Sequence, residues 1–166
     1  RKNVPEAEYL TQMRDPGNIV EFDDLHTYFF TDAGVVKAVN GVSFDIPAHS
    51  IVGVVGESGC GKSITSMSLM QLVQAPQGQI VSGAIRFQSD KLIPAGKEPM
   101  TKEVTDENGT VHTEPVLDKK GNPRYRPVFR KEPQVVDIAK MPSSAMSRIR
   151  GREVSMIFQE PMTSLN

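Results

Sequence analysis

The first half of the chain carries apolar and polar positions at the short periods of β-strands. Residues 19–31 are strand formers with partial alternation, residues 31–34 supply a turn, and residues 35–39 are strand formers again, which predicts an antiparallel pair. Residues 42–46 alternate apolar and polar side chains and predict a further strand. The apolar run at residues 51–55 is short and rich in β-branched residues, so it predicts a buried strand.

The second half combines helical and strand periods around one long interruption. The apolar spacing predicts a helix over residues 64–73 and a strand over residues 80–87. After the interruption, residues 143–149 predict a short helix and residues 153–158 predict another alternating strand. The predicted chain therefore mixes β-strands with a few helices.

The interruption at about residues 89–142 has a different composition from the rest. It holds seven of the chain's twelve prolines and interleaves charges without helical periodicity, which indicates an inserted arm. Asn108-Gly109 between strand formers predicts a hairpin, and residues 120–123 predict a second one. Residues 1–18 show little periodicity and predict a loose N-terminal arm, so we expect the domain itself to span residues 19–166.

Composition narrows the classes of partner. With 38% hydrophobic and 23% charged residues the chain is ordinary for a soluble domain, and 19 basic against 20 acidic residues create no field that would attract nucleic acid. No apolar run approaches the roughly 18 residues of a membrane span, and the N-terminus lacks a signal-peptide pattern. We therefore expect a cytoplasmic protein that meets a membrane only through protein partners. The single cysteine, Cys60, has no internal disulfide partner.

One motif carries chemistry, at residues 56–63 between the predicted strand and the predicted helix. It fits G-x-x-x-x-G-K-[ST] at every fixed position. Glycines let backbone N–H groups curl around a phosphate, and the following helix N-terminus offers unpaired donors. Lys62 supplies a charge for the outer phosphates, and Ser63 a hydroxyl for Mg²⁺. The motif predicts a nucleotide site formed by Gly56, Glu57, Ser58, Gly59, Cys60, Gly61, Lys62 and Ser63.

Two further side chains are candidates for the same site. The aromatic cluster at residues 28–30, which includes Phe29, has rings that can stack on a base, although its spacing alone favours ordinary core or surface aromatics. Gln159 follows the predicted strand at residues 153–158, where a polar side chain can reach a metal ion or an attacking water. Spacing alone leaves both roles open.

Residues 34–44, 53–63 and 149–166 together resemble an ABC transporter ATPase, and within that family the branch of oligopeptide, dipeptide and nickel importers. The resemblance covers roughly residues 19–87 and 143–166. It implies an α/β P-loop NTPase fold, with an antiparallel β-subdomain, a phosphate-loop strand and helix, and a hairpin-rich insertion. It also implies that the insertion is far longer than the usual link in this branch.

The resemblance also implies roles for individual residues. Phe29 falls at the position of the family's adenine-stacking aromatic, and Gln159 matches the Q-loop glutamine. The implied ligands are ATP and Mg²⁺, with Lys62 and Gln159 taking part in catalysis and Ser63 and Gln159 at the metal. Residues 160–166, with Gln159, would face transmembrane permease subunits on the inner face of the cell membrane. A second ATPase subunit and, indirectly, an external substrate-binding protein complete the implied partners.

The family's signature sequence, Walker B strand and switch histidine have no match in these 166 residues. Residues 19–24 imitate a Walker B strand but precede the phosphate loop instead of following it. We therefore expect the chain to be the N-terminal part of a longer ATPase that does not turn ATP over by itself.

Two other classes of function compete with this interpretation. A P-loop GTPase or kinase is one, because residues 106–109 and 118–121 both fit the D-x-x-G pattern of GTPases, although no Asn-Lys-x-Asp follows. A non-catalytic interaction module with a vestigial nucleotide loop is the other. Intact Lys62 and Ser63 oppose that module, and a preference for ATP, GTP or neither would separate the three classes.

Overall fold

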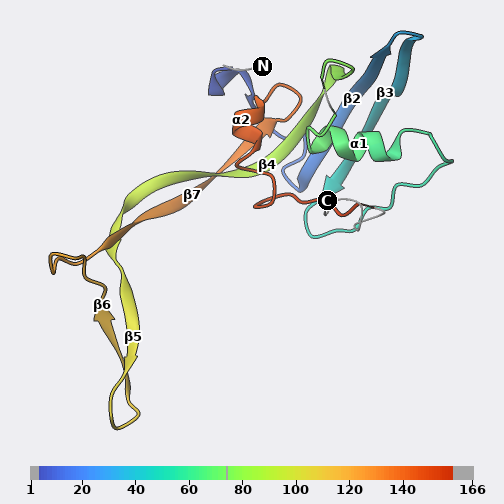
Figure 1. The fold of residues 1–166 in the computed structure, drawn as a ribbon. Coiled ribbons are helices and arrows are strands. Elements are labelled where there is room, and N and C mark those ends of the chain that lie inside the picture. The colour runs from blue at the N-terminus through green and yellow to red at the C-terminus, as the bar shows by residue number, and fades with distance from the viewer. Residues whose placement is uncertain (1–3, 74, 159–166) are drawn as a thin grey trace. The chain divides into compact units, whose positions relative to one another are not determined.

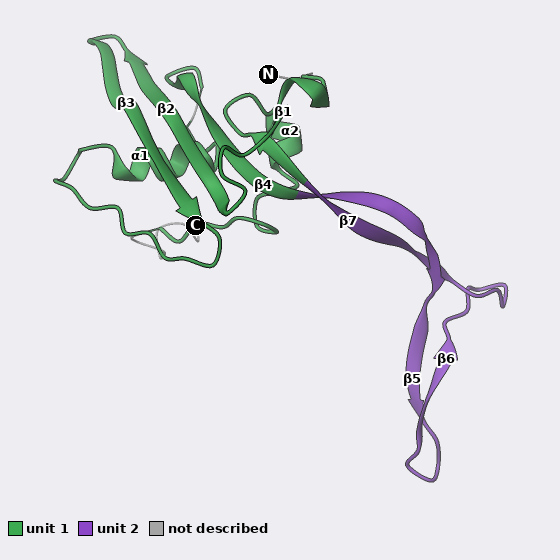
Figure 2. Cartoon of the chain, turned by 180° about the vertical axis from the view of Figure 1, so that it is seen from behind, with its two compact units in different colours: residues 1–89, 134–166 green, residues 90–133 purple. Residues whose placement is uncertain are grey.

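The structure is a computed structural model that describes residues 4–73 and 75–158. The chain divides into two compact units, which Figure 2 distinguishes by colour. Unit 1 comprises residues 1–89 and 134–166, and unit 2 comprises residues 90–133. Unit 1 contains the phosphate-loop motif, and unit 2 contains the predicted hairpins.

Strands dominate the described residues, and two short α-helices accompany them (Figure 1). Strand order in the larger sheet is β1-β7-β4-β2-β3, and β5 and β6 form a separate two-stranded sheet. The elements in chain order are a 3₁₀ turn η1 (Glu6–Glu8), β1 (Leu10–Thr11), β2 (Asn18–Thr31), β3 (Gly34–Pro47), α1 (Lys62–Leu69), β4 (Gly78–Pro99), β5 (Thr101–Thr105), β6 (Val111–Pro115), β7 (Tyr125–Asp137) and α2 (Ser143–Met146).

The β2–β3 hairpin confirms the predicted antiparallel pair and extends it. Thr31 pairs with Gly34 across the turn, and β3 runs without interruption through both segments that the pattern separated. Further along, the rings of Phe22 and Phe44 stack with centroids 4.5 Å apart, which places β2 and β3 side chains on the same core. That core contains mostly strand residues, with Leu25, Ile85 and Val136 among its fully buried members.

A buried carboxylate ties the N-terminal segment to this sheet. Glu21 is 0% exposed and accepts hydrogen bonds from the backbone N–H groups of Arg14 and Asp15, both at 2.9 Å, and from Asn18 Nδ2 at 3.1 Å. Burial on its own would raise the pKa of Glu21, but these donors outweigh it and lower the pKa to about 2. The Walker B imitation around Glu21 is therefore structural.

The N-terminal segment is more ordered than its sequence predicts. Tyr9 is buried in the core, and β1 pairs with β7 through Leu10 opposite Val136. The prediction of a loose arm therefore fails for the stretch that follows η1. The short strand forms because β7 offers it an edge, and a neighbour of that kind is invisible in the local pattern. The proposed domain boundary at residue 19 stays a prediction.

The predicted buried strand at residues 51–55 is wrong. These residues form no strand, and their side chains are exposed, with Val55 93% exposed. The predicted strand at residues 153–158 is also absent, apart from an isolated bridge between Val154 and Arg150. A strand requires a neighbour for its backbone hydrogen bonds, and no strand among the described residues pairs with either segment. The antiparallel part of the predicted fold is present, but the phosphate-loop strand is not.

Both predicted helices are present but shorter than expected. The first ends at Leu69 instead of continuing to residue 73, because Gln71 has a φ of 48°, a left-handed conformation that breaks the helix. The second is a single turn, Ser143–Met146, that follows Pro142. Element type was therefore predictable here, whereas the ends depended on contacts that the pattern does not show.

Unit 2 confirms both predicted hairpins. β5 and β6 pair in register, with Val104 opposite His112, around the Asn108-Gly109 turn, where Gly109 has a φ of 83°. A bridge between Leu117 and Pro123 closes the second hairpin. The compact unit is narrower than the predicted arm, because residues 134–142 belong to unit 1, where they contribute Val136 and other buried side chains.

Unit 2 should be removable without loss of the unit 1 core. Replacing residues 90–133 with a short glycine-serine linker joins β4 to β7, which are neighbours in the sheet, and should leave thermal unfolding cooperative with little change in Tm. Extending the replacement to residue 142 also removes Ile138 and Met141, and such losses cost about 2–5 kcal/mol each. We expect that longer deletion to unfold; equal stability of the two variants would contradict the boundary at residue 133.

Candidate nucleotide site

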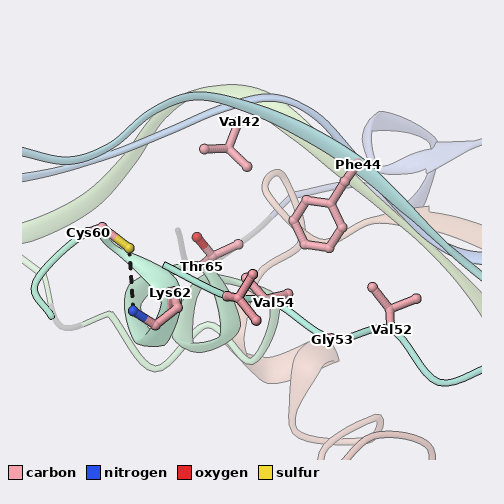
Figure 3. A pocket seen from close by; sticks show the side chains of 9 residues that line it. Val42, Phe44, Val52, Gly53, Val54, Cys60, Lys62 and Thr65 are labelled. Atoms are coloured by element: carbon pink, nitrogen blue, oxygen red, sulfur yellow. Dashed lines mark hydrogen bonds between the residues drawn. The ribbon is translucent and has the colours of Figure 1, made fainter. Parts of the chain in front are cut away.

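The phosphate-loop motif forms an exposed loop that ends at the start of α1. Lys62 is the first residue of the helix, and its Nζ donates hydrogen bonds to the carbonyl oxygens of Gly56 at 2.7 Å and Glu57 at 2.6 Å. The same nitrogen lies 3.4 Å from Cys60 Sγ (Figure 3). The loop therefore curls around the ammonium group of its own lysine, the group that the motif predicts to contact the outer phosphates.

The loop passes close to β3, and only glycine fits at one position. Gly61 precedes the helix with a φ of 91°, and a Cβ there would lie 2.3 Å from the carbonyl oxygen of Ala38. A real Cβ atom cannot approach backbone so closely, so the sequence requirement for glycine has a steric cause as well as a conformational one. The close contact fixes the loop against the sheet immediately before Lys62.

A small pocket opens at the N-terminus of α1. It has a volume of about 140 Å³, and its lining consists of Ala38, Gly59, Cys60, Gly61, Lys62, Ser63 and Ile64. The first hydrogen bond along the helix axis runs from Thr65 N–H to Gly61 O at 2.9 Å, so the preceding N–H groups have no acceptor within the helix. Free donors, a helix N-terminus and one ammonium group form a chemical setting that suits a phosphate group.

A second pocket, of about 400 Å³, is mostly apolar, and Figure 3 shows the side chains that line it. Side chains of Val42 and Phe44 from β3 line one side, residues 52–55 line another, and Cys60, Lys62 and Thr65 complete it. The apolar residues that predict a buried strand thus line an open pocket, because the described residues provide no strand to cover them. The two pockets share Cys60 and Lys62.

The helix itself is anchored on the sheet by a buried polar pair. Thr27 Oγ1 of β2 and Ser68 Oγ of α1 are 2.9 Å apart, and both residues are fully buried. Two hydroxyl groups that satisfy each other avoid the desolvation penalty of burial and fix the helix along its axis. α1 packs against β2 and β3, so the phosphate loop is held by the most extensively paired part of unit 1.

The structure separates the predicted site residues into three groups. Residues 59–63 line the small pocket. The carbonyls of Gly56 and Glu57 accept the hydrogen bonds from Lys62 Nζ, and Ser58 lies on the exposed loop that joins them to the pocket residues. Phe29 is half-buried on β2 next to Gly78, and it lines neither pocket. Its role at adenine stays a prediction. Gln159 and the coupling surface at residues 160–166 lie outside the described residues, so their roles also stay predictions.

The two D-x-x-G matches serve as turns. Asp106 Oδ1 accepts the N–H groups of Asn108 and Thr110, both at 2.9 Å, and closes the tip of the β5–β6 hairpin. Asp118 Oδ1 accepts the equivalent pair in the second hairpin, and the N–H bonds from Asn122 and Lys120 hold the pKa of Asp118 below its usual range. Both carboxylates are occupied by their own turns, so neither supports a GTPase site.

The sequence did not predict a role for two residues near the C-terminal end of α1. Arg150 donates hydrogen bonds to the carbonyls of the two residues that directly follow the helix. Gln71 donates hydrogen bonds to carbonyls of the segment that follows β7. No local pattern marks either residue, since their partners are remote in the sequence. Among the residues that the structure describes, no cluster of His, Cys, Asp or Glu side chains has the arrangement of a metal site.

Comparison with known proteins identifies the family. A family model described as ABC transporter matches residues 39–165. The oligopeptide transport ATP-binding protein AppD of Bacillus subtilis (strain 168) is 36% identical over 148 residues, which are 89% of this chain and 31% of that protein. The dipeptide transport ATP-binding protein DppD of the same organism is 30% identical over 148 residues, 89% of this chain and 30% of that protein. A putative peptide import ATP-binding protein of Brucella abortus (strain 2308) is 33% identical over 148 residues, 89% of this chain and 32% of that protein.

These matches agree with the site geometry and with the resemblance drawn from the sequence. The chain spans about a third of the length of these relatives, and no solved structure matches it. In the described part of the chain, neither helix is long and apolar enough to span a membrane. The α/β P-loop NTPase class is confirmed by the family match, although the described sheet is mostly antiparallel. The matched region contains the whole phosphate loop and most of the chain, and the chain therefore belongs to the ABC transporter family.

Proposed function

We propose that this chain is the ATP-binding part of an ABC transporter ATPase that powers the import of peptides, or of nickel, through membrane-embedded partner subunits. The observation that carries the proposal is the phosphate loop with Lys62 at the head of α1, inside a family match over residues 39–165. The relatives AppD and DppD are named as oligopeptide and dipeptide transport ATP-binding proteins, which supports a peptide cargo.

The residues at the loop suit the phosphates of ATP. Lys62 Nζ donates to two backbone carbonyls, and it would exchange these neutral acceptors for the charged oxygens of the outer phosphates, which accept stronger hydrogen bonds. The free N–H groups at the start of α1 would donate to the same phosphates. Ser63 lines the small pocket and would bind Mg²⁺, which neutralises phosphate charge when bound. Phe29 would stack on adenine, and Gln159 would reach the metal and the attacking water.

We assign ATP hydrolysis to the full-length protein. Phosphoryl transfer to water requires a residue that orients the water, commonly a carboxylate. Neither pocket at the loop is lined by a carboxylate within the described part of the chain. Residues 1–166 by themselves would therefore bind ATP without turning it over.

The proposed partners follow from the same assignment. Residues 159–166 would contact transmembrane permease subunits, so the protein would lie on the cytoplasmic inner face of the cell membrane. A second ATPase subunit would complete the catalytic sites, and an external substrate-binding protein would deliver the cargo indirectly. The relatives are named as transport ATP-binding proteins, which supports a complex with membrane-embedded subunits.

Nucleotide preference in the full-length protein tests the proposal. Calorimetric titration should show tighter binding of ATP than of GTP, and phosphate release from ATP should require Mg²⁺. Residues 1–166 expressed alone should release no phosphate above background. Tighter binding of GTP would favour the GTPase class, and binding of neither nucleotide would favour a non-catalytic module. Metal-dependent turnover by residues 1–166 alone would overturn the assignment of hydrolysis to the intact protein.

A further inference from the structure

The C-terminal end of α1 is held by a reciprocal set of hydrogen bonds. Arg150 donates from Nε to Met70 O at 2.7 Å and from Nη2 to Gln71 O at 2.9 Å. Gln71 donates in return from Nε2 to Ile138 O at 2.6 Å and to Met141 O at 2.7 Å. The chain after β7 and the chain after α1 are therefore linked in both directions.

The chemistry of this contact favours a strong and directional link. The last carbonyl groups of a helix carry partial negative charge, and a cation placed there is stabilised. The planar guanidinium of Arg150 reaches two consecutive carbonyls at once, which a lysine ammonium on a flexible stem does not reproduce. Met70, Met141 and Met146 are buried around the contact, so water competes weakly for these hydrogen bonds.

The backbone on either side of Arg150 is also fixed. Arg150 N–H donates to Met146 O at 3.0 Å, and Gly151, with a φ of 76°, donates its N–H to Val154 O at 2.8 Å. Glu153 N–H donates to Ile149 O at 2.9 Å. Residues 149–154 thus form a compact turn that the side chain of Arg150 links to the end of α1, while Ile149 and Val154 pack on the core.

These contacts place Arg150 between two functional segments. The N-terminus of α1 carries Lys62 and the phosphate loop, and the same eight-residue helix ends at Leu69, directly before the two carbonyls that Arg150 binds. On its other side, the turn at residues 149–154 precedes Gln159 in the sequence, the residue that the proposed function assigns to the metal and the attacking water. Contiguous hydrogen bonds and rigid elements are one physical means by which two separate sites are coupled.

We propose that Arg150 is a positioning residue that transmits nucleotide occupancy from α1 to the turn at residues 149–154. The inference rests on the proposed function, because it requires a nucleotide at Lys62. Nucleotide bound at the N-terminus of α1 restrains the helix, and the forked hydrogen bonds of Arg150 pass that restraint to the turn. Without them, the phosphate loop still binds nucleotide, but the turn no longer responds.

Hydrogen exchange in the full-length protein tests the inference, with ATP in the absence of Mg²⁺ so that no turnover occurs. In the wild type, ATP should slow amide exchange both in α1 and at residues 151–154. In Arg150→Met, slowing in α1 should remain while slowing at residues 151–154 is lost. Arg150→Lys should retain part of the response, since one donor at a time can reach a carbonyl. Arg148→Met is the matched control, because Arg148 is a nearby exposed arginine, and it should behave as the wild type.

The outcomes separate the inference from the proposed function. Full slowing at residues 151–154 in Arg150→Met, with α1 also slowed, would overturn the role of Arg150 and leave nucleotide binding intact. Absence of any slowing in wild-type α1 would overturn the proposed function and the inference together. Where Arg150→Met fails to fold, Gln71→Met and Arg150→Lys decide: a wild-type response at residues 151–154 in both variants overturns the coupling, and a weakened response supports it.

Discussion

Replacement of Lys62 with alanine in the full-length protein is expected to weaken ATP binding by about 2–3 kcal/mol, or roughly 30- to 150-fold, the range for a hydrogen bond to a charged group. Lys62 is the ammonium group at the small pocket, and its Nζ already bonds to the loop carbonyls of Gly56 and Glu57. The variant loses the charge at the phosphates and the bonds that close the loop. Calorimetric titration of ATP into the folded variant measures the effect.

The matched control for this variant is Lys37→Ala. Lys37 is an exposed lysine on β3 whose Nζ lies 5.6 Å from the ring centre of Tyr28, and it lines neither pocket. Its removal lowers the net charge by the same amount, so ATP affinity should stay near that of the wild type. An unchanged affinity in folded Lys62→Ala would remove Lys62 from the nucleotide site.

Gly61→Ala is expected to cost more than the left-handed backbone alone explains. The φ of 91° at this position costs an L-residue about 1–2 kcal/mol, and the new Cβ would lie 2.3 Å from the carbonyl oxygen of Ala38. The oxygen belongs to the backbone of β3 and cannot rotate away, so either the loop or the strand must shift. We expect a total loss of about 3 kcal/mol or more in the free energy of unfolding, together with weaker ATP binding, by denaturant titration and calorimetry.

Gly59→Ala separates the two causes. Gly59 has a φ of 80°, and a Cβ there would meet nothing within 4 Å. The variant should therefore show only the conformational cost, about 1–2 kcal/mol. Equal destabilisation by the two substitutions would show that the close approach of Gly61 to β3 has no energetic consequence.

Several features were predictable because their causes are local. The Asn108-Gly109 turn supplies a positive φ at glycine between strand formers, and the β5–β6 hairpin follows. The turn of the β2–β3 hairpin is encoded by a few adjacent residues. The start of α1 near Lys62 is likewise encoded by the residues directly around it. The phosphate-loop motif is recognisable for the same reason, since its residues are contiguous, and their contacts with nucleotide stay predictions.

Other features depended on neighbours that no local pattern reveals. Residues 51–55 have the composition of a buried strand, yet no strand of the described chain pairs with them, and residues 52–55 line an open pocket instead. Residues 10–11 sit in a stretch predicted to be loose, yet β7 provides an edge and β1 forms. Apolar periodicity specifies which face a segment would bury, whereas strand formation also needs a partner for the backbone.

The sequence by itself determined the phosphate-loop motif, because its glycines, Lys62 and Ser63 are contiguous, and the motif predicts the nucleotide site. Only the tertiary structure decided that glycine at position 61 is required by the approach of β3, and that Arg150 binds carbonyls 79 and 80 positions earlier in the chain. The tertiary structure also decided that Glu21, within the Walker B-like residues 19–24, is a buried carboxylate with a structural role. These contacts join residues far apart in sequence, so their energies depend on packing that no window of the sequence contains.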